Sequence, residues 1–413
     1  MKVKCFYALS LLFVFGIAGT AKAVGEVPIP VAIEAEIAGL IPGDTIRFEL
    51  VKLPGWNLEP AFDIVVSEPN KFSYTAEVSP CSLCYLMSYK PLSGEKVIAD
   101  RMGLTLILGA DAVKIEGKVE TIYLSSLEGG VYDNPILKEI ESIESMLSVE
   151  RMEVMKESAN AAAVGDTAKE AELRDEFVSL YDKRKEEYDR RSLLEKEYLE
   201  RYPSSVWTLV YLLQRSSVLS IEEMQTMSLK VSNEAKESCY GMLLEEKIKS
   251  REGLLPGNDA PDFNLTTITG ESISLKDFSG SYLLIYHWGL CPGSIMNEMM
   301  VSKFCEEYKE HLKVVGLTAD INSIREFYDK ASPGEMYVNV EIKPVLESML
   351  AHPWPDSETT SGNNEQIKRD YDVAGLPYFI FISPDGKIVA KDFHGVLMKA
   401  AEILEAEYPK SQP

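Results

Sequence analysis

The sequence has few histidines and a shortage of positive charge. Its four histidines show no metal-binding spacing such as His-Glu-x-x-His, and His287 with Cys291 would give copper only two ligands, so we expect no metal site. The 42 basic residues face 65 acidic ones, giving a formal net charge of −23 at pH 7, which argues against nucleic acid as a partner. A phosphate-binding loop and a dinucleotide fingerprint are both missing, so we expect no cofactor.

Long apolar runs are missing after the first 23 residues. Residues 1–23 combine a basic start, an apolar run over residues 6–17 and the ending Ala21-Lys22-Ala23, which is typical of a cleaved signal peptide. The run is shorter than the roughly 20 residues that span a bilayer. Cys5 precedes the run, so it is not the lipid-bearing cysteine of a bacterial lipoprotein. We therefore expect a periplasmic or otherwise extracytoplasmic protein that is soluble, with no stable membrane anchor, after cleavage.

Three segments of the remaining chain differ in their apolar periodicity. Residues 24–128 alternate apolar and polar side chains, as over residues 33–37, which predicts an antiparallel β-sandwich-like domain. Residues 129–253 carry an apolar stripe at helical spacing among many charges, which predicts a helical connector. Residues 254–413 alternate strand and helix patterns, which predicts an α/β domain with a mixed sheet and helices on both faces.

One cysteine lies where a strand pattern meets a helix pattern. The stretch "HWGLCPGS", residues 287–294, ends a buried strand and precedes a helix predicted over residues 294–312. A helix N-terminus favours thiolate over thiol, and Ser294 is placed to cap the helix or to hydrogen-bond the sulfur of Cys291. The alternative is an inert buried cysteine, because free cysteine is among the most buried residue types.

Two longer stretches resemble a known family. "PGNDAPDFNLTTITGESISLKDFSGSYLLIYHW" and, later, "YDVAGLPYFIFISPDGKIV" resemble the thioredoxin-fold module of extracytoplasmic thiol–disulfide oxidoreductases of the TlpA/ResA type. The resemblance covers about residues 254–413 and implies a thioredoxin-like fold there. The β-rich segment before it resembles, more weakly, a domain of unknown function that often precedes such modules.

The family's active-site motif is altered in this chain. Members usually carry two cysteines at the helix start, of which the first attacks a disulfide and the second resolves the mixed disulfide. An alignment with one deletion puts Cys291 on the attacking position and Ser294 on the resolving one, whereas an ungapped alignment anchored on Trp288 puts Pro292 and Ile295 there. We prefer the gapped alignment because it keeps a cysteine at the turn. It predicts a single working thiol, whose mixed disulfides an external low-molecular-weight thiol resolves.

The resemblance implies roles for further residues. Pro377 matches the family's cis-proline, where the backbone of Leu376 pairs with an extended substrate strand; the alternative is a trans proline at a strand entry. Glu298 matches a glutamate behind the cysteines that serves as a proton shuttle; the alternative is a surface glutamate. The predicted site therefore has Cys291, Ser294 and Glu298 as catalytic residues and Trp288, Leu376 and Pro377 as substrate-binding residues.

The other cysteines are expected to be structural. Cys81 and Cys84 form a Cys-x-x-Cys within the β-rich segment, where a local turn disulfide or two opposite strand faces are favoured over redox catalysis. Cys305 follows Ser294 by 11 residues, about 16 Å along a helix, which is beyond the reach of about 7 Å for bridged Cα atoms. Cys239 is expected in a core. The polar stretch over residues 351–371 is expected to be a solvated connector, with the border of a substrate groove as the alternative.

Two functions remain open at this point. The first is an exported thiol–disulfide oxidoreductase that acts on protein thiols or disulfides through Cys291, and the second is a redox-inactive binding module with the same fold. Peroxide reduction is disfavoured because the proline and threonine that precede a peroxidatic cysteine are absent from "LIYHWG".

Overall fold

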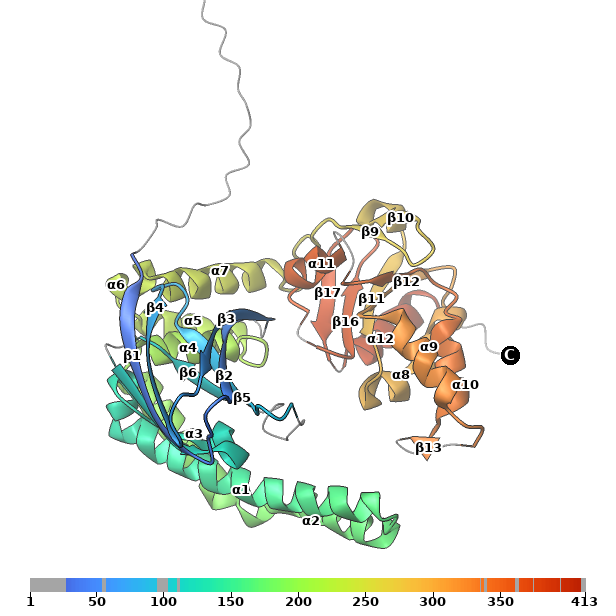
Figure 1. The fold of residues 1–413 in the computed structure, drawn as a ribbon. Helices are drawn as coiled ribbons and strands as arrows, with labels where there is room; N and C mark the ends of the chain where they lie inside the picture. Colours follow the sequence, from blue (N-terminus) through green and yellow to red (C-terminus); the bar gives the residue numbers. More distant parts are fainter. Residues whose placement is uncertain are drawn as a thin grey trace, which may run out of the picture. The chain divides into compact units, whose positions relative to one another are not determined.

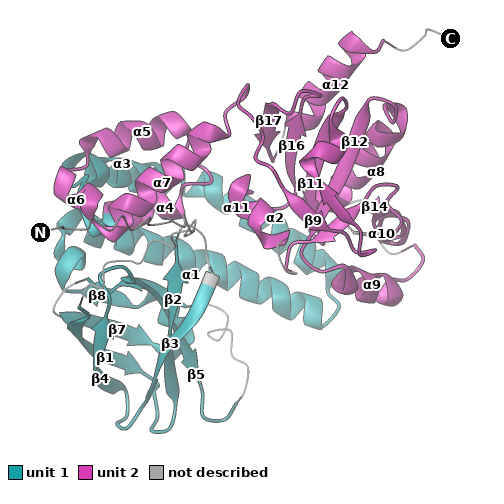
Figure 2. Cartoon of the chain, turned by 90° about the horizontal axis from the view of Figure 1, so that it is seen from above, with its two compact units in different colours: residues 1–207 teal, residues 208–413 magenta. Residues whose placement is uncertain are grey.

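The structure is a computed structural model that describes residues 27–53, 57–94, 103–109, 112–334, 336–337, 340–360, 364–373, 375–393 and 395–409. The predicted signal peptide lies outside the described residues. The chain divides into two compact units, residues 1–207 and 208–413, which Figure 2 shows in different colours. This division falls inside the segment predicted as a helical connector.

Two four-stranded sheets make up the first part of unit 1. One has the order β4 (Lys71–Val78), β1 (Ile29–Ala38), β7 (Ala112–Lys118), β8 (Ser126–Glu128), and the other β3 (Asn57–Val65), β2 (Thr45–Lys52), β5 (Cys84–Lys90), β6 (Leu104–Ile107). The predicted alternation is present, since Ile33 and Ile37 are fully buried whereas Glu34 is exposed. Both sheets contribute side chains to one apolar cluster.

One strand pair departs from the antiparallel prediction. Strands β1 and β7 run parallel, with Ile33 opposite Val113. Strands that follow each other in the chain can pair antiparallel through a tight turn, whereas parallel strands need a long connection. Between β1 and β7 the chain runs through the second sheet, which supplies such a connection. Two 3₁₀ turns follow in this region, η2 (Val119–Leu124) and η3 (Gly130–Asp133).

Helices complete unit 1 and begin unit 2. In unit 1, α1 (Pro135–Ala163) packs against α2 (Thr167–Lys183) and α3 (Lys185–Arg201). Helix α1 starts where Asn134 accepts a hydrogen bond from the Ile136 amide and Pro135 takes the first position. Helix α4 (Val206–Gln214) crosses the division, and α5 (Ile221–Lys230), α6 (Asn233–Glu237) and α7 (Cys239–Gly253) follow in unit 2.

A buried group of charges attaches α7 to the C-terminal region within unit 2. Asp372 is 9% exposed and forms ion pairs with Lys247 and Arg251 of α7 and with Lys391. Burial is the largest effect on Lys391 and lowers its pKa to about 8, although Asp372 acts in the opposite direction. Removing Asp372 would leave three cations without their shared carboxylate.

The C-terminal region is built on a five-stranded mixed sheet (Figure 1). Its order is β15 (Asp356–Glu358), β12 (Leu312–Thr318), β11 (Tyr282–Trp288), β16 (Tyr378–Ile382), β17 (Ile388–Asp392). The first three strands are parallel, and β16 and β17 pair antiparallel with their neighbours. Smaller elements accompany it, namely β9 (Asn264–Thr266), β10 (Ser272–Ser274), η4 (Leu275–Phe278), β13 (Met336–Tyr337) and β14 (Val340–Glu341).

Apolar layers cover both faces of this sheet, as predicted. On one face, Tyr286 and Trp288 of β11 share a cluster with α8 (Pro292–Glu307), α9 (Ile321–Lys330), α10 (Ile342–Leu350) and α12 (Val396–Glu407). On the other face, Ile285 lies with residues from the segment 254–265 and from α11 (Glu365–Asp370). The strand therefore sends successive side chains into two different cores.

The polar stretch over residues 351–371 is not a simple connector, contrary to the prediction. It contains the edge strand β15 and the helix α11. The strand is only three residues long, and Asp356 and Ser357 are buried polar residues, so no apolar alternation marks it in the sequence.

Among the described residues, no helix is both long and apolar enough to cross a bilayer.

Candidate active site

Cys291 occupies the N-cap position of α8. Its sulfur accepts a hydrogen bond from the Ser294 amide at 3.3 Å, and Cys291 Sγ and Ser294 Oγ lie 3.2 Å apart. Pro292 takes the first helical position, and Cys291 is partly exposed. The sulfur therefore serves as the helix cap, and an amide donor at a helix N-terminus favours the thiolate.

Ser294 joins the two sides of the Cys291 turn. Its side chain is fully buried, and besides the sulfur its hydroxyl accepts a hydrogen bond from the Gly289 amide at 3.3 Å. The hydroxyl thus holds the loop before Cys291 to the first turn of α8. It has no sulfur with which to resolve a mixed disulfide.

The segment Leu376–Pro377 lies against this turn. The Leu376–Pro377 peptide bond is cis, as expected, and Pro377 is buried. A Cβ atom on Gly293 would come within 2.6 Å of Pro377 Cδ, and one on Gly289 within 3.1 Å of Leu376 Cδ1. The backbone on both sides of Cys291 therefore approaches Leu376 and Pro377 closely, and Leu376 remains 37% exposed.

His287 supports the same segment from the strand. Its Nδ1 lies 2.7 Å from the Gly375 carbonyl oxygen, to which an Nδ1–H donates. Burial lowers the pKa of His287 to about 4, so the ring is neutral near pH 7. This contact fixes β11 to the residue just before Leu376.

In the described part of the chain, no group of three or more histidine, cysteine or acidic residues is arranged to hold a metal ion.

Trp288 does not belong to a substrate-binding surface, contrary to the prediction. Its side chain is 0% exposed, and its Nε1 donates to Asp356 Oδ1 at 2.8 Å. The reason is its place on β11, where alternate side chains face the layer of α8 and α10. Trp288 is a core residue that leads into the Cys291 turn.

Glu298 is a buried residue of α8, which rules out the surface alternative. Its carboxylate accepts hydrogen bonds from Ser302 Oγ at 3.0 Å and from Ser348 Oγ at 2.8 Å. Both of its oxygens lie 3.2 Å from His352 Nε2. A buried carboxylate needs such partners because burial without them is costly.

His352 and Asp356 complete a cluster that the sequence analysis missed. His352 Nδ1 lies 2.8 Å from Asp356 Oδ2, and its ring stacks on Trp354 with centroids 4.2 Å apart. Burial lowers the pKa of His352, but hydrogen bonds and charges from Asp356 and Glu298 outweigh it and raise that pKa to about 9. We call Glu298, His352 and Asp356 the acid–imidazole cluster. Its only sequence signal is the stretch "HPWPD", in which two ionisable residues flank a tryptophan within a polar segment.

The remaining cysteines differ from the prediction in two respects. Cys84 is a buried thiol at the start of β5, whereas Cys81 and Cys239 are each disulfide-bonded, so the local Cys81–Cys84 disulfide and the core assignment of Cys239 are wrong. Sequence spacing favoured a local bridge, but Cys84 belongs to a strand whose side chains fill the core. Helix α8 is continuous to Glu307, so Cys305 stays about three turns from the Cys291 turn.

Exposed apolar side chains occupy the two segments that meet at Cys291. Leu290 is 39% exposed, and Met296, Met299 and Met300 on the first turns of α8 are 54–70% exposed, while Leu376 lies on the other segment. We call these five residues the apolar rim. Methionine surfaces are adaptable, and exposed apolar patches mark interaction sites.

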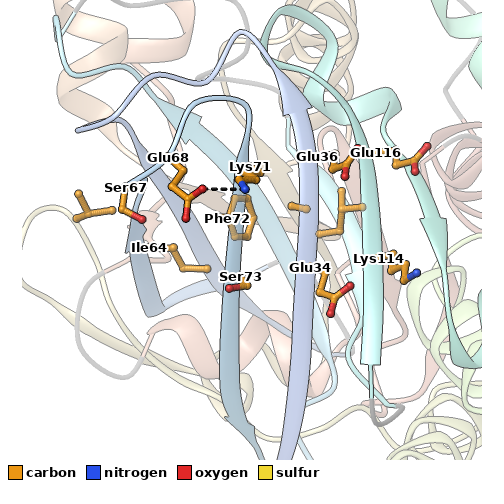
Figure 3. A pocket seen from close by; sticks show the side chains of 13 residues that line it. Glu34, Glu36, Ile64, Ser67, Glu68, Lys71, Phe72, Ser73, Lys114 and Glu116 are labelled. Atoms are coloured by element: carbon orange, nitrogen blue, oxygen red, sulfur yellow. Dashed lines mark ion pairs between the residues drawn. The ribbon is translucent and has the colours of Figure 1, made fainter.

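The β-rich domain carries a separate charged groove (Figure 3). It has a volume of about 410 Å³, and charged side chains of β1, β4 and β7 line it. Glu34 lies opposite Lys114, Glu36 lies opposite Lys71, and Lys71 also pairs with Glu68 at 2.8 Å. Cross-strand pairs of opposite charge account for these residues as an exposed sheet face. We assign no chemistry to this groove.

A known protein family matches the C-terminal region. Residues 256–391 match the model of the AhpC/TSA family. The C-terminal region has a thioredoxin-like fold. Among curated proteins, the thioredoxin-like protein YneN of Bacillus subtilis is 36% identical over 70 residues, which is 17% of this chain and 41% of that protein. The thiol-disulfide oxidoreductase ResA of Bacillus subtilis is 26% identical over 141 residues, which is 34% of this chain and 68% of that protein.

Solved structures also match part of this chain. A thiol-disulfide oxidoreductase from Bacteroides fragilis is 25% identical and matches with a TM-score of 0.28, covering 36% of this chain and 100% of that one. The thioredoxin domain of a thiol-disulfide oxidoreductase from Bacteroides vulgatus is 23% identical, with a TM-score of 0.28, and covers 37% and 98%. The residues that match the AhpC/TSA model, 256–391, include Cys291, Glu298 and Pro377.

Proposed function

We propose that this protein is an exported thiol–disulfide oxidoreductase that acts on protein thiols or disulfides through Cys291 alone. The observation that carries the proposal is the position of Cys291 Sγ, which caps α8 beside the Leu376–Pro377 segment. The thioredoxin-like fold and the names of the relatives support this reaction class.

The reaction needs only one protein sulfur at each step. The Cys291 thiolate attacks one sulfur of a substrate disulfide, a new S–S bond forms, and the other substrate sulfur leaves as a thiolate. Ser294 has no thiol to attack this mixed disulfide. An external thiolate of low molecular weight must attack the substrate sulfur instead, which forms a disulfide with the substrate and releases the Cys291 thiolate.

The surroundings of Cys291 support a protein substrate. The exposed side chains of the apolar rim offer apolar contact area on the two segments that meet at Cys291. The close approach of Leu376 to the Cys291 turn supports pairing of its backbone with an extended chain, as in strand addition. In this account Leu376 and Pro377 are the substrate-binding residues, Cys291 is the nucleophile, and Ser294 stabilises its thiolate.

Export is the second part of the proposal. The pattern of residues 1–23 and the disulfide bonding of Cys81 and Cys239 both support an oxidising compartment, because disulfides persist outside the cytoplasm. We also propose that residues 24–128 form a β-sandwich-like domain, which the apolar cluster shared by its two sheets supports.

A redox-inactive binding module is the alternative, because the described chain offers no second thiol near Cys291. Trapping distinguishes the two functions. Wild-type protein, Cys291→Ala and the matched control Cys305→Ser are incubated with a disulfide-bonded model protein and separated without reductant. We expect adducts with wild type and Cys305→Ser that persist until glutathione is added, and none with Cys291→Ala. Adducts that do not depend on Cys291, or no adduct at all, would favour the binding module.

A further inference from the structure

Both ring nitrogens of His352 face carboxylates. Nδ1 lies 2.8 Å from Asp356 Oδ2, and Nε2 lies 3.2 Å from both oxygens of Glu298. A neutral imidazole has one N–H and one lone pair, so one of two carboxylates would face the lone pair. An imidazolium donates to both, and the geometry is therefore that of a cation held between two anions.

The surroundings of the ring are consistent with a cation. The His352 side chain is 1% exposed and lies between Trp354, which stacks on it, and Trp288, whose ring meets it edge-on with centroids 4.6 Å apart. Within the described part of the chain, the charged groups at hydrogen-bond distance from the ring are Glu298 of α8 and Asp356 of β15. The raised pKa of His352, about 9, agrees with this assignment.

The remaining neighbours of the cluster are neutral donors. Ser302 of α8 and Ser348 of α10 donate their hydroxyls to Glu298, and Trp288 of β11 donates its N–H to Asp356. These three side chains therefore all present donors to the two carboxylates. His352 lies between the carboxylates as the group that would balance their charge.

The acid–imidazole cluster lies on the inner side of the Cys291 turn, a position that we describe as beneath Cys291. Glu298 follows Cys291 by seven residues, about 10 Å along the axis of α8, and helical side chains point back toward the N-terminus. The Tyr286 hydroxyl donates to the Ser294 carbonyl oxygen at 3.4 Å. Burial raises the pKa of Tyr286, and the charges of Glu298, Cys291 and Asp356 raise it further. The Tyr286 hydroxyl is therefore close enough to all three groups to be affected by their charges.

We propose that His352 is a positioning residue: as an imidazolium it holds Glu298 as a carboxylate, so that the charge beneath Cys291 stays constant across the neutral pH range. This inference rests on the proposed function of Cys291. It replaces the proton-shuttle role expected for Glu298, because a carboxylate that is paired with a fixed cation does not exchange protons with the nearby thiol.

Loss of the imidazolium should make the charge beneath Cys291 depend on pH. A buried carboxyl without a cation takes up a proton at higher pH than an exposed one. In His352→Gln, Glu298 should therefore change its charge within the neutral range. One unit of charge at about 10 Å alters the thiolate reactivity roughly two- to seventeenfold for effective dielectric constants between 20 and 80.

The experiment measures the rate at which iodoacetamide alkylates Cys291 in the full-length protein from pH 5 to pH 8.5, with Cys291 followed by peptide mass spectrometry. Wild type should show one ionisation, and His352→Gln a second inflection of roughly two- to seventeenfold. The double variant Glu298→Gln with His352→Gln should lose that inflection. His311→Gln, which replaces a histidine stacked on Tyr408, is the matched control and should behave as wild type.

A spectroscopic measurement separates this inference from the proposed function. The ¹⁵N chemical shifts of His352 should report an imidazolium at pH 7 whether or not Cys291 reacts with substrates. A neutral ring at pH 7, or a folded His352→Gln variant with the wild-type pH profile, would overturn the inference. Failure of Cys291 to form adducts, with His352 still an imidazolium, would overturn only the proposed function.

Discussion

Gly316 is the position at which a single methyl group should damage the acid–imidazole cluster. It lies in β12, and a Cβ atom there would come within 1.7 Å of Asp356 Oδ1 and 2.7 Å of Trp288 Nε1. Both atoms belong to the hydrogen bond that anchors Asp356. Gly316→Ala therefore cannot be accommodated without moving Asp356 away from Trp288.

The expected magnitude follows from two costs. A lost hydrogen bond to a charged group costs about 1.5–3 kcal/mol, and an overpacked core costs about 1–3 kcal/mol more. We expect Gly316→Ala to lower the free energy of unfolding by roughly 3–5 kcal/mol. For a unit of this size, each kcal/mol lowers the melting temperature by about 2–4 °C, so the total decrease should be about 10 °C.

Thermal unfolding followed by tryptophan fluorescence tests this expectation, since Trp288 and Trp354 both lie at the cluster. Gly253→Ala is the matched control, because Gly253 ends α7 and has no heavy atom within 4 Å of the added Cβ. The control should melt at or slightly above the wild-type temperature. A melting temperature of Gly316→Ala within about 1 °C of wild type would refute the close approach and the anchoring role of Asp356.

Three further predictions concern the same unit. Ser294→Ala removes the hydroxyl 3.2 Å from Cys291 Sγ and should slow alkylation of Cys291 at pH 7 about fivefold, whereas an unchanged rate would show that the hydroxyl does not stabilise the thiolate. The pKa of His352 is about 9 in the folded chain against 6.5 when free, so its contribution of about 3 kcal/mol is complete below pH 6.5 and should be lost as the pH rises to 9. Urea unfolding at several pH values should show this slope in wild type and not in the double variant Glu298→Gln with His352→Gln, which lacks both groups of the pair. Asp372→Asn should destabilise unit 2 by about 3–5 kcal/mol in the same assay, because Lys247, Arg251 and Lys391 lose their shared carboxylate. A decrease in the free energy of unfolding smaller than that for the loss of an exposed ion pair would contradict this role.

Local sequence signals predicted the parts of the structure that depend on neighbours along the chain. The buried run that became β11, the helix that follows it and the cis bond before Pro377 each have a signature within a few residues. The helix runs over Pro292–Glu307 and not over the predicted residues 294–312, because Cys291 caps it and Pro292 takes its first position. The position of Cys291 between strand and helix followed from these signals. The alternation of Ile33 and Ile37 likewise placed β1 in a sheet.

Contacts between distant positions escaped the sequence analysis. Glu298 and His352 are 54 positions apart, and nothing in either local pattern indicates that they meet. Strand β15 carries polar residues, so periodicity does not reveal it, and the fully buried Trp288 was assigned to a surface because the motif gave its position without its environment. The disulfide bonding of Cys239 was not predicted because nothing in its helical pattern marks it, and for Cys81 spacing favoured the nearby Cys84 as partner.

The most direct test of a single working thiol is the stoichiometry of its reaction with an aromatic disulfide such as Ellman's reagent, corrected with Cys291→Ala. The account predicts that Cys291 in wild type releases about one equivalent of nitrothiobenzoate and keeps the other as a stable mixed disulfide until glutathione is added. Ser294→Cys should release about two equivalents, because the introduced thiol resolves the adduct. A second equivalent released by wild type without added thiol, or no release that depends on Cys291, would contradict the account.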